Sequence, residues 1–260
     1  MLYTRAGKDK IAMEQYIKRH LFTAIFHRSV RLIITLSSAL FLLACMSATL
    51  GLSERPVIAQ SYVKIMPLGD SITFGVHSTK NGGYRVTLWN VLQAAHLHIT
   101  FVGSEESGPD SLPDKANEGH PGWRIDQISA HIVAWLEKYQ PRIILLHIGT
   151  NDIIQNHSVS TAPARLHSLL VQITTTLPDA TVIVAQLIPL GNPRLDAKVI
   201  AYNKTIPGIV STMQAQGKHV RYVNMYNAVP LRDIPDHIHP DNLGYTVMAS
   251  VWYKALQPLL

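Results

Sequence analysis

From residue 63 onward, short apolar runs rich in β-branched residues alternate with longer segments whose apolar residues recur at helical spacing. Each short run is typical of a strand buried on both faces. Strands are expected at 63–68, 98–102, 143–148, 181–188 and 220–223, and helices at 84–95, 125–139, 162–177, 195–216 and 243–256. Because each crossover can hold a helix, the strands are expected to run parallel. The sequence therefore predicts an α/β fold, a three-layer α/β/α sandwich around a central parallel sheet of about five strands.

The expected sheet also predicts where a ligand would bind. In sheets of this kind the site lies beyond the carboxyl ends of the strands. Ser71, Gly103 and Asn151 each follow one of the first three expected strands. The longest stretch without a clear helix or strand pattern, 103–124, begins at the second of these positions. One edge of the sheet can therefore bring these three residues together.

The net charge of +6 is concentrated near the N-terminus. Residues 1–60 contain eight Lys/Arg and three Asp/Glu, whereas residues 61–260 contain fifteen and fourteen. Within the first part, 32–52 is a run of 21 residues without charge, and seven basic residues precede it. A basic flank before an apolar run is typical of an export signal, which predicts an extracytoplasmic body at 61–260. The nearly neutral body offers no electrostatic basis for binding nucleic acid.

The sequence leaves three fates open for the N-terminal segment 1–60. Cleavage after Ala59 would release the body, the run 32–52 could stay as a membrane anchor, or Cys45 in Leu42-Leu43-Ala44-Cys45 could carry a lipid. Cys45 is also the single cysteine, so the body has neither a disulfide nor a cysteine-based metal site. We expect a secreted or membrane-tethered monomer.

The body contains residue types suited to acyl transfer from an ester. Ser71 lies in Gly69-Asp70-Ser71, where Gly69 permits a tight turn after the strand, although the same residues also suit a helix cap. Asn151 can stabilise a developing alkoxide with its neutral amide, or it can simply cap a turn. Gly103 could contribute only its backbone N–H.

A histidine with a carboxylate partner lies near the C-terminus. Asp236 and His239 are three residues apart, which lets one short loop hold the imidazole against the carboxylate. His237 leaves the assignment open, because a His-x-His pair could bind a metal ion, but no third ligand has a recognisable spacing. His77 and most other histidines lack a paired motif and are expected on the surface or in packing, and His147 in the core.

The four blocks Gly69-Asp70-Ser71-Ile72-Thr73, Gly103, Gly149-Thr150-Asn151-Asp152 and Asp236-His237-Ile238-His239-Pro240 resemble, in order and spacing, those of the SGNH hydrolases, or GDSL esterases. The resemblance implies the flavodoxin-like sandwich of that superfamily. It implies Ser71 as nucleophile, and Asp236 and His239 as the other triad members. It also implies an oxyanion hole formed by the N–H groups of Ser71 and Gly103 and the amide of Asn151.

A further segment, Glu118-Gly119-His120-Pro121-Gly122-Trp123, resembles a stretch of the carbohydrate esterase family 3 and acetylxylan esterase branch. The resemblance implies that Asp70, His120 and Trp123 help to bind substrate, with Trp123 stacked on a sugar face. The other interpretation is a Pro/Gly turn with Trp123 packed beneath it. Phe74 stands where a smaller or acidic residue is frequent in the branch, which implies an acyl pocket of different shape.

Together these features predict a serine esterase that removes short acyl groups, chiefly acetyl, from carbohydrate through a Ser-His-Asp acyl-enzyme mechanism. The sequence requires neither a metal ion nor an organic cofactor. Two alternatives stay open. The chain could be a lipid-directed esterase or lysophospholipase that meets its substrate through 32–52, or a non-catalytic carbohydrate-binding module on a hydrolase scaffold.

Overall fold

The computed structural model describes residues 62–260. The sequence predictions for 1–60, which include the run 32–52, Ala59 and Cys45, lie outside the described residues. Within 62–260, none of the helices combines the length and the apolar character that crossing a membrane requires.

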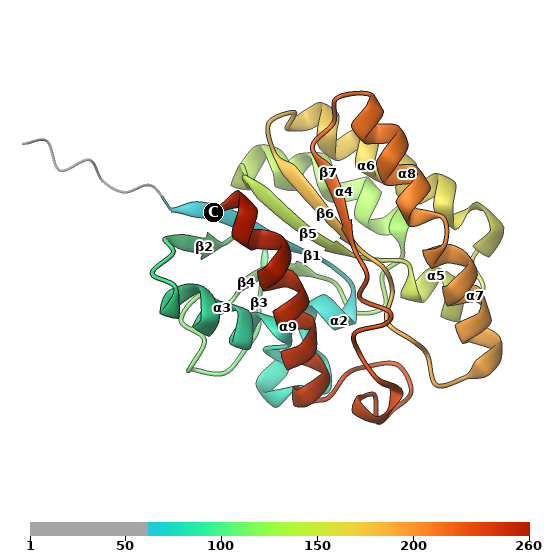
Figure 1. Ribbon diagram of the computed structural model, residues 1–260, viewed down its shortest axis with the longest axis horizontal. Helices are drawn as coiled ribbons and strands as arrows, with labels where there is room; N and C mark the ends of the chain where they lie inside the picture. Colours follow the sequence, from blue (N-terminus) through green and yellow to red (C-terminus); the bar gives the residue numbers. More distant parts are fainter. Residues whose placement is uncertain (1–61) are drawn as a thin grey trace, which may run out of the picture. The chain divides into compact units, whose positions relative to one another are not determined.

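The described residues form a seven-stranded sheet with helices packed on both faces (Figure 1). The strands are β1 (Val63–Gly69), β2 (Ile99–Phe101), β3 (Glu105–Glu106), β4 (Ala116–Gly119), β5 (Ile143–His147), β6 (Thr181–Ala185) and β7 (Val220–Val223). The helices are α2 (Ser71–Phe74), α3 (Tyr84–Ala94), α4 (Ile125–Tyr139), α5 (Thr150–Ile154), α6 (Ala162–Thr176), α7 (Pro193–Asn203), α8 (Ile206–Ala215) and α9 (Asn242–Leu256). The α/β sandwich is confirmed.

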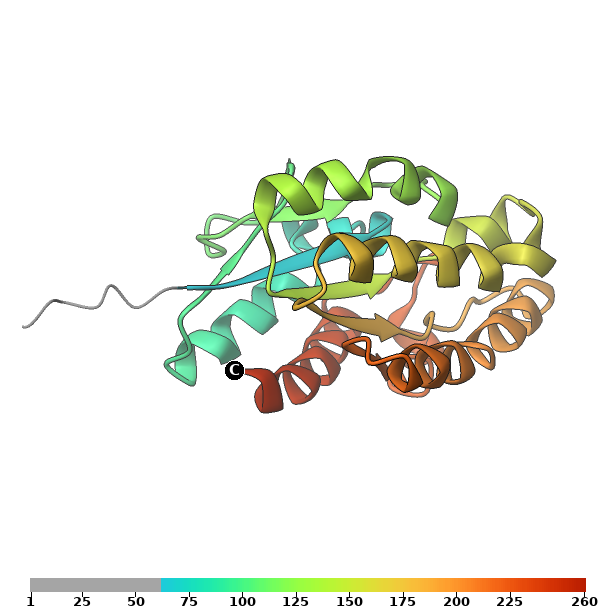
Figure 2. The same ribbon diagram turned by 90° about the horizontal axis from the view of Figure 1, so that it is seen from above.

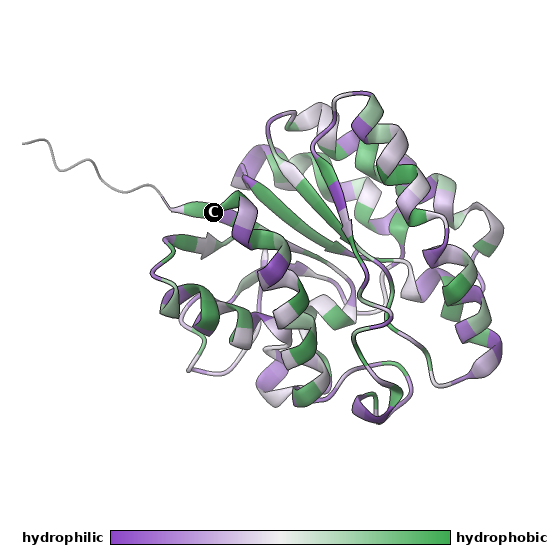
Figure 3. Cartoon of the chain, in the orientation of Figure 1, coloured by the Kyte–Doolittle hydropathy of each residue, from purple (hydrophilic) through white to green (hydrophobic). Residues whose placement is uncertain are grey.

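Alternating residues of the central strands build two separate cores. Met66 and Leu68 of β1 pack with α4 and α6, whereas Ile65 of the same strand packs with α3 and α9. The period of two follows from the pleat, because successive side chains point to opposite faces of a strand. The two helical layers lie on opposite sides of the sheet (Figure 2), and the central strands β5 and β6 are hydrophobic along most of their length (Figure 3).

The expectation of about five strands, all parallel, was wrong in one region. Residues 103–124 contribute two further strands, β3 and β4, which pair antiparallel to each other. Strand β4 then runs parallel to the end of β1, at Leu68 and Gly69, while β2 pairs with the start of β1. These strands are short and polar, so they lack the apolar run that marks the other strands in the sequence.

One expected helix is also interrupted. The segment 195–216 forms α7 and α8, which meet at Lys204 and Thr205. Pro207 lies in the first turn of α8, where a proline is tolerated because that N–H has no helical partner. The apolar periodicity continues across the break, which is why the sequence suggested one helix.

Candidate active site

Ser71 stands at the carboxyl end of the central strand β1. Gly69 ends the strand, and a Cβ there would overlap the backbone carbonyl of His147 on β5, so the close approach of the two strands requires glycine. The Asp70 side chain then accepts a hydrogen bond from the Ile72 N–H and caps α2. Ser71 is the first residue of that helix, so its own N–H has no helical acceptor.

Asp236 and His239 reach Ser71 from the loop that precedes α9. The Ser71 hydroxyl lies 2.8 Å from His239 Nε2, although the two residues are 168 positions apart. On the other side of the ring, His239 Nδ1 lies 2.7 Å from Asp236 Oδ2. A ring proton on Nδ1 donates to the carboxylate and leaves Nε2 free to accept the serine proton. The geometry is therefore that of a nucleophile, a base and an orienting carboxylate in series.

The Asp236 carboxylate is held in its ionised form. Partial burial alone would raise its pKa, but hydrogen bonds from the His239 ring and from the backbone N–H groups of His239 and Ile238 outweigh burial and lower the pKa to about 2. The carboxylate thus remains charged at neutral pH and can stabilise an imidazolium on His239.

Asn151 lies in the first turn of α5, which follows β5 beside β1. Its Nδ2 donates a hydrogen bond of 3.0 Å to the carbonyl of Trp123. An amide nitrogen carries two hydrogens, so the second remains available to an oxyanion while the first fixes the orientation of the amide. This contact gives Asn151 a defined geometry, which a residue that only caps a turn would not need.

Replacing Asn151 with alanine is expected to lower kcat about 10²- to 10³-fold, because one oxyanion donor is lost. The measurement is steady-state hydrolysis of p-nitrophenyl acetate. Asn156→Ala is the matched control, since Asn156 follows α5 and its side chain accepts only an exposed hydrogen bond from Lys198. Equal kcat for the wild type and Asn151→Ala would remove this residue from the oxyanion hole.

Gly103 follows β2 and rests on β4. A Cβ at this position would overlap the backbone of Asn117, so the contact requires glycine. The next residue, Ser104, is held by the buried Glu118 carboxylate, which accepts from its N–H at 2.7 Å and its hydroxyl at 2.9 Å. Because Glu118 of the same strand β4 pairs with Leu68 near the end of β1, β4 holds Gly103 close to the strand end that carries Ser71.

The sequence analysis singled out His120 and Trp123, and the structure places both in an aromatic stack. The His120 ring stacks on both Trp123, at 4.3 Å, and Trp135, at 4.8 Å between ring centroids, and the two indoles also contact each other. Its Nε2 lies 2.8 Å from Glu118 Oε2, and little of the ring is exposed. Trp123 is half-buried and is tied to the site through its carbonyl, which binds Asn151. The aromatic stack is thus connected to the Asn151 amide through the Trp123 carbonyl.

The structure contradicts the role expected for Asp70. It was expected to bind substrate, but it is fully buried, and its Oδ1 caps α2. Burial raises its pKa to about 7, against the lowering effect of the Ile72 N–H. Asp70 therefore acts as the buried cap of the helix that begins at Ser71, and it has no exposed surface with which to contact substrate.

Asp70→Asn is expected to be more favourable to stability, relative to the wild type, at pH 8 than at pH 5. Because the pKa of Asp70 is raised in the folded state, the native protein binds more protons than the unfolded chain between about pH 4 and 7. Wild-type stability therefore falls as pH rises through that window, and the neutral amide removes this loss. The free energy of unfolding in urea should favour the variant by on the order of 2 kcal/mol more at pH 8 than at pH 5.

The exposed Asp110 provides the control for that comparison. A hydrogen bond from Lys115 lowers the pKa of Asp110, so its carboxylate is ionised at both pH values. The stability difference between Asp110→Asn and the wild type should therefore be the same at pH 5 and pH 8. A pH-independent difference for Asp70→Asn as well would contradict the buried-acid assignment.

Two histidines behave differently from the sequence expectation. His77 is exposed, as expected, but its Nε2 lies 3.2 Å from Asp236 Oδ2, beside the His239 ring. His237 has the left-handed φ of 68° and packs against Gly191, and it is not among the three clustered ligands that include His239. Among the described residues, the cluster that contains His239 is therefore completed by His77 and Asp236, and His237 of the His-x-His pair that the sequence left open is not part of it.

Arg85, which the sequence analysis did not consider, anchors the segment after the nucleophile. Its buried guanidinium donates to the carbonyls of Thr73 and Phe74 and to those of Ser107 and Lys115, at 2.9–3.3 Å. Burial lowers its pKa to about 10, so it remains charged at neutral pH. An arginine within an apolar helical pattern was the available signal, but its acceptors come from α2 and from the segments on either side of 108–114.

Comparison with known proteins accords with this geometry. Residues 68–247 match the family described as "GDSL-like Lipase/Acylhydrolase family". A multidomain esterase from Ruminococcus flavefaciens is 30% identical over 251 residues, which cover 84% of this chain and 32% of that protein, so the chain spans about a third of its relative.

Two solved structures superpose on most of the chain. A family 3 carbohydrate esterase from Clostridium thermocellum is 38% identical, with a TM-score of 0.71, and a family 3 carbohydrate esterase from Talaromyces cellulolyticus is 27% identical, with a TM-score of 0.64. Each superposition covers 76% of this chain and 97% of the other. The resemblance stated from the four sequence blocks is confirmed: this chain belongs to the GDSL-like lipase/acylhydrolase family.

Proposed function

We propose that this chain is a serine esterase that removes acetyl groups from carbohydrate. The observation that carries the proposal is the continuous series from the Ser71 hydroxyl to His239 Nε2, at 2.8 Å, and from His239 Nδ1 to Asp236, at 2.7 Å. Nucleophilic catalysis requires a base within hydrogen-bond reach of the nucleophile and a third group that orients the base. These three side chains meet both requirements.

The geometry supports a two-step mechanism. Ser71 Oγ attacks the ester carbonyl while His239 Nε2 takes its proton, and the N–H groups of Ser71 and Gly103 with the Asn151 amide stabilise the oxyanion. His239 then gives the proton to the departing sugar oxygen, which leaves an acetyl group on Ser71. A water molecule, deprotonated by the same imidazole, releases acetate and restores the serine.

Carbohydrate is the proposed substrate class for two reasons. Two solved structures that superpose on most of this chain are named family 3 carbohydrate esterases. In addition, the half-buried Trp123 lies next to Asn151, where an indole can contact a sugar that carries the ester. Trp123 and its neighbour His120 are therefore proposed to shape the sugar site, with Trp123 making the contact.

The test is acetate release by the full chain from acetylated xylan, other acetylated polysaccharides and acetylated peptidoglycan. Release from at least one of them, with loss in Ser71→Ala, is the expected result. Trp123→Ala should raise KM for the polysaccharide and leave turnover of p-nitrophenyl acetate within a few fold, because only the polysaccharide carries a sugar at that position. If the protein hydrolyses p-nitrophenyl acetate but releases no acetate from any acetylated carbohydrate, the proposed substrate class is contradicted.

A lipid-directed esterase would use the same triad on a different acyl chain. A series of p-nitrophenyl esters from acetate to palmitate distinguishes the two, since the proposal predicts the highest kcat/KM for acetate. A maximum at long chains would favour the lipid substrate. A non-catalytic sugar-binding module is distinguished by a fluorophosphonate probe, which should label Ser71 in an esterase and leave such a module unlabelled.

We further propose that the esterase domain acts outside the cytoplasm, as a monomer. The support is the basic segment followed by the uncharged run 32–52 in the sequence. Fractionation of expressing cells tests the location, and the size of the full chain in solution tests the monomer.

A further inference from the structure

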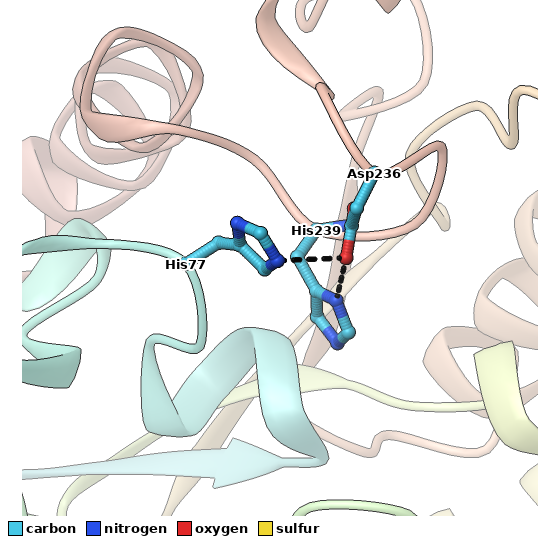
Figure 4. A group of neighbouring side chains, drawn as sticks. All are labelled: His77, Asp236 and His239. Carbon is cyan, nitrogen blue, oxygen red and sulfur yellow. Dashed lines mark hydrogen bonds and ion pairs between the residues drawn. The ribbon is translucent and has the colours of Figure 1, made fainter.

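A second imidazole shares the carboxylate of the triad. His77 Nε2 lies 3.2 Å from Asp236 Oδ2, the same oxygen that His239 Nδ1 contacts at 2.7 Å. The two rings are stacked, with their centroids 5.8 Å apart and an angle of 12° between their planes. Figure 4 shows one ring nitrogen of each histidine directed at the same oxygen of the Asp236 carboxylate. The proposed ester mechanism uses only one of these two imidazoles.

The backbone around His77 is fixed to the elements that carry the triad. The preceding residue, Val76, donates its N–H to the Ser71 carbonyl at 3.0 Å, and its own carbonyl accepts from the Tyr245 hydroxyl at 2.8 Å. His77 has a φ of 69°, which histidine tolerates better than most residues. The segment is thus attached to α2 at one point and to α9 at another, and the imidazole is held near Asp236.

The three side chains form a ligand set of two nitrogens and one oxygen. One ligand atom from each of them lies within 4.8 Å of the others. Zn²⁺ binds histidine nitrogen and carboxylate oxygen at about 2.0–2.2 Å, so its ligand atoms are roughly 3.3 Å apart in a tetrahedron. The His77 side chain is 47% exposed, so it can make the remaining movement of up to about 1.5 Å, and solvent can fill the fourth position.

We propose that His77, Asp236 and His239 form an inhibitory site for Zn²⁺. The metal ion occupies the position between His239 Nδ1 and the carboxylate, where the ring proton lies in the active enzyme. That proton moves to Nε2, so the imidazole stays neutral and no proton is gained or lost. Nε2 then carries a hydrogen and cannot accept the proton of Ser71, which leaves the serine without its base.

Metal binding and inhibition of ester hydrolysis are measured separately, because the loss of rate rests on the proposed esterase activity and metal binding does not. Binding is measured first, with the full chain and Co²⁺, which takes the same ligands as Zn²⁺ and absorbs strongly in visible light when tetrahedral. The wild type should develop this absorption on titration. His77→Asn should lose it, and asparagine suits the left-handed backbone at this position.

Inhibition is measured as turnover of p-nitrophenyl acetate at free Zn²⁺ concentrations set by a metal buffer. The zinc concentration for half-inhibition should rise at least about tenfold in His77→Asn, because removal of even an indirect partner of a metal site costs about 10- to 100-fold in affinity. EDTA should restore the rate, and Mg²⁺, which prefers oxygen ligands, should not inhibit.

The matched control is His157→Asn. His157 has a similar exposure, 41%, and lies near a carboxylate, Asp126, at 3.9 Å, without being one of the clustered ligands. This variant should keep the zinc sensitivity and the Co²⁺ spectrum of the wild type. Should His77→Asn fold poorly, His77→Gly provides the same test, since glycine adopts the required φ without strain.

The outcomes are distinct. Equal zinc sensitivity in the wild type and His77→Asn overturns the proposal, and so does a Co²⁺ spectrum that is the same in both. A Co²⁺ spectrum that depends on His77, in a protein that hydrolyses none of the esters, supports the metal site and contradicts the proposed function instead.

Discussion

Ser71→Ala is expected to lower kcat for p-nitrophenyl acetate by about 10⁶-fold. The hydroxyl of Ser71 is the only nucleophile in contact with His239 among the described residues, so its removal leaves catalysis to the oxyanion hole and binding alone. The fold should remain intact, because alanine is favourable at the first position of a helix and the cap of α2 comes from Asp70. The measurements are the rate and the far-ultraviolet circular dichroism.

Ser250→Ala is the matched control for this variant. Ser250 lies on the exposed face of α9, and its hydroxyl donates only to the Thr246 carbonyl one turn earlier. Its rate should equal that of the wild type. A Ser71→Ala protein that still turns over more than a small fraction of the substrate, after contaminating esterase is excluded, would show that another group attacks the ester.

Asp236→Asn is expected to lower kcat about 10⁴-fold with little change in KM. The asparagine oxygen can still accept from the N–H groups of Ile238 and His239, so the loop should keep its shape. Its NH₂ group, however, would face His239 Nδ1 and make that nitrogen an acceptor. The ring proton would then sit on Nε2, which is the wrong tautomer for taking a proton from Ser71.

Asp241→Asn provides a matched control two residues beyond His239. The Asp241 side chain caps α9 through the N–H groups of Leu243 and Gly244, and asparagine caps helices equally well. Turnover in this variant should be unchanged. A similar loss of rate in both variants would mean that disturbance of the loop, rather than the tautomer of His239, explains the effect of Asp236→Asn.

The strands that the sequence predicted are those with a continuous apolar run. β5 and β6 are buried on both faces, and burial favours apolar side chains at all but one of their buried positions, His147 of β5 being the exception. β3 and β4 were missed because their residues, Glu105–Glu106 and Ala116–Gly119, show no such run. Their strand geometry comes from pairing with each other and with the end of β1, which is a property of the folded sheet.

The candidate site also contains residues that the sequence predicted and features that it did not. Short local motifs identified Ser71, Asn151, Asp236 and His239. Each of these residues lies in or next to a turn that a few neighbouring residues define. The buried state of Asp70 was not predicted, since the motif does not say which way the carboxylate points. The role of Glu118, which holds both Ser104 and His120, was missed because Ser104 lies in the segment between β2 and β3 and His120 lies just beyond β4.

By itself the sequence determined the alternation of strands and helices and the family, and it named Ser71, His239 and Asp236 as the candidate nucleophile, base and orienting carboxylate. These depend on periodicity and on motifs of a few residues, which are local. Only the tertiary structure decided that His77 shares Asp236 with His239 and that Arg85 anchors the loops around the nucleophile. Such contacts arise from the packing of α2, α3 and α9 at one end of the sheet, and no spacing along the chain records them.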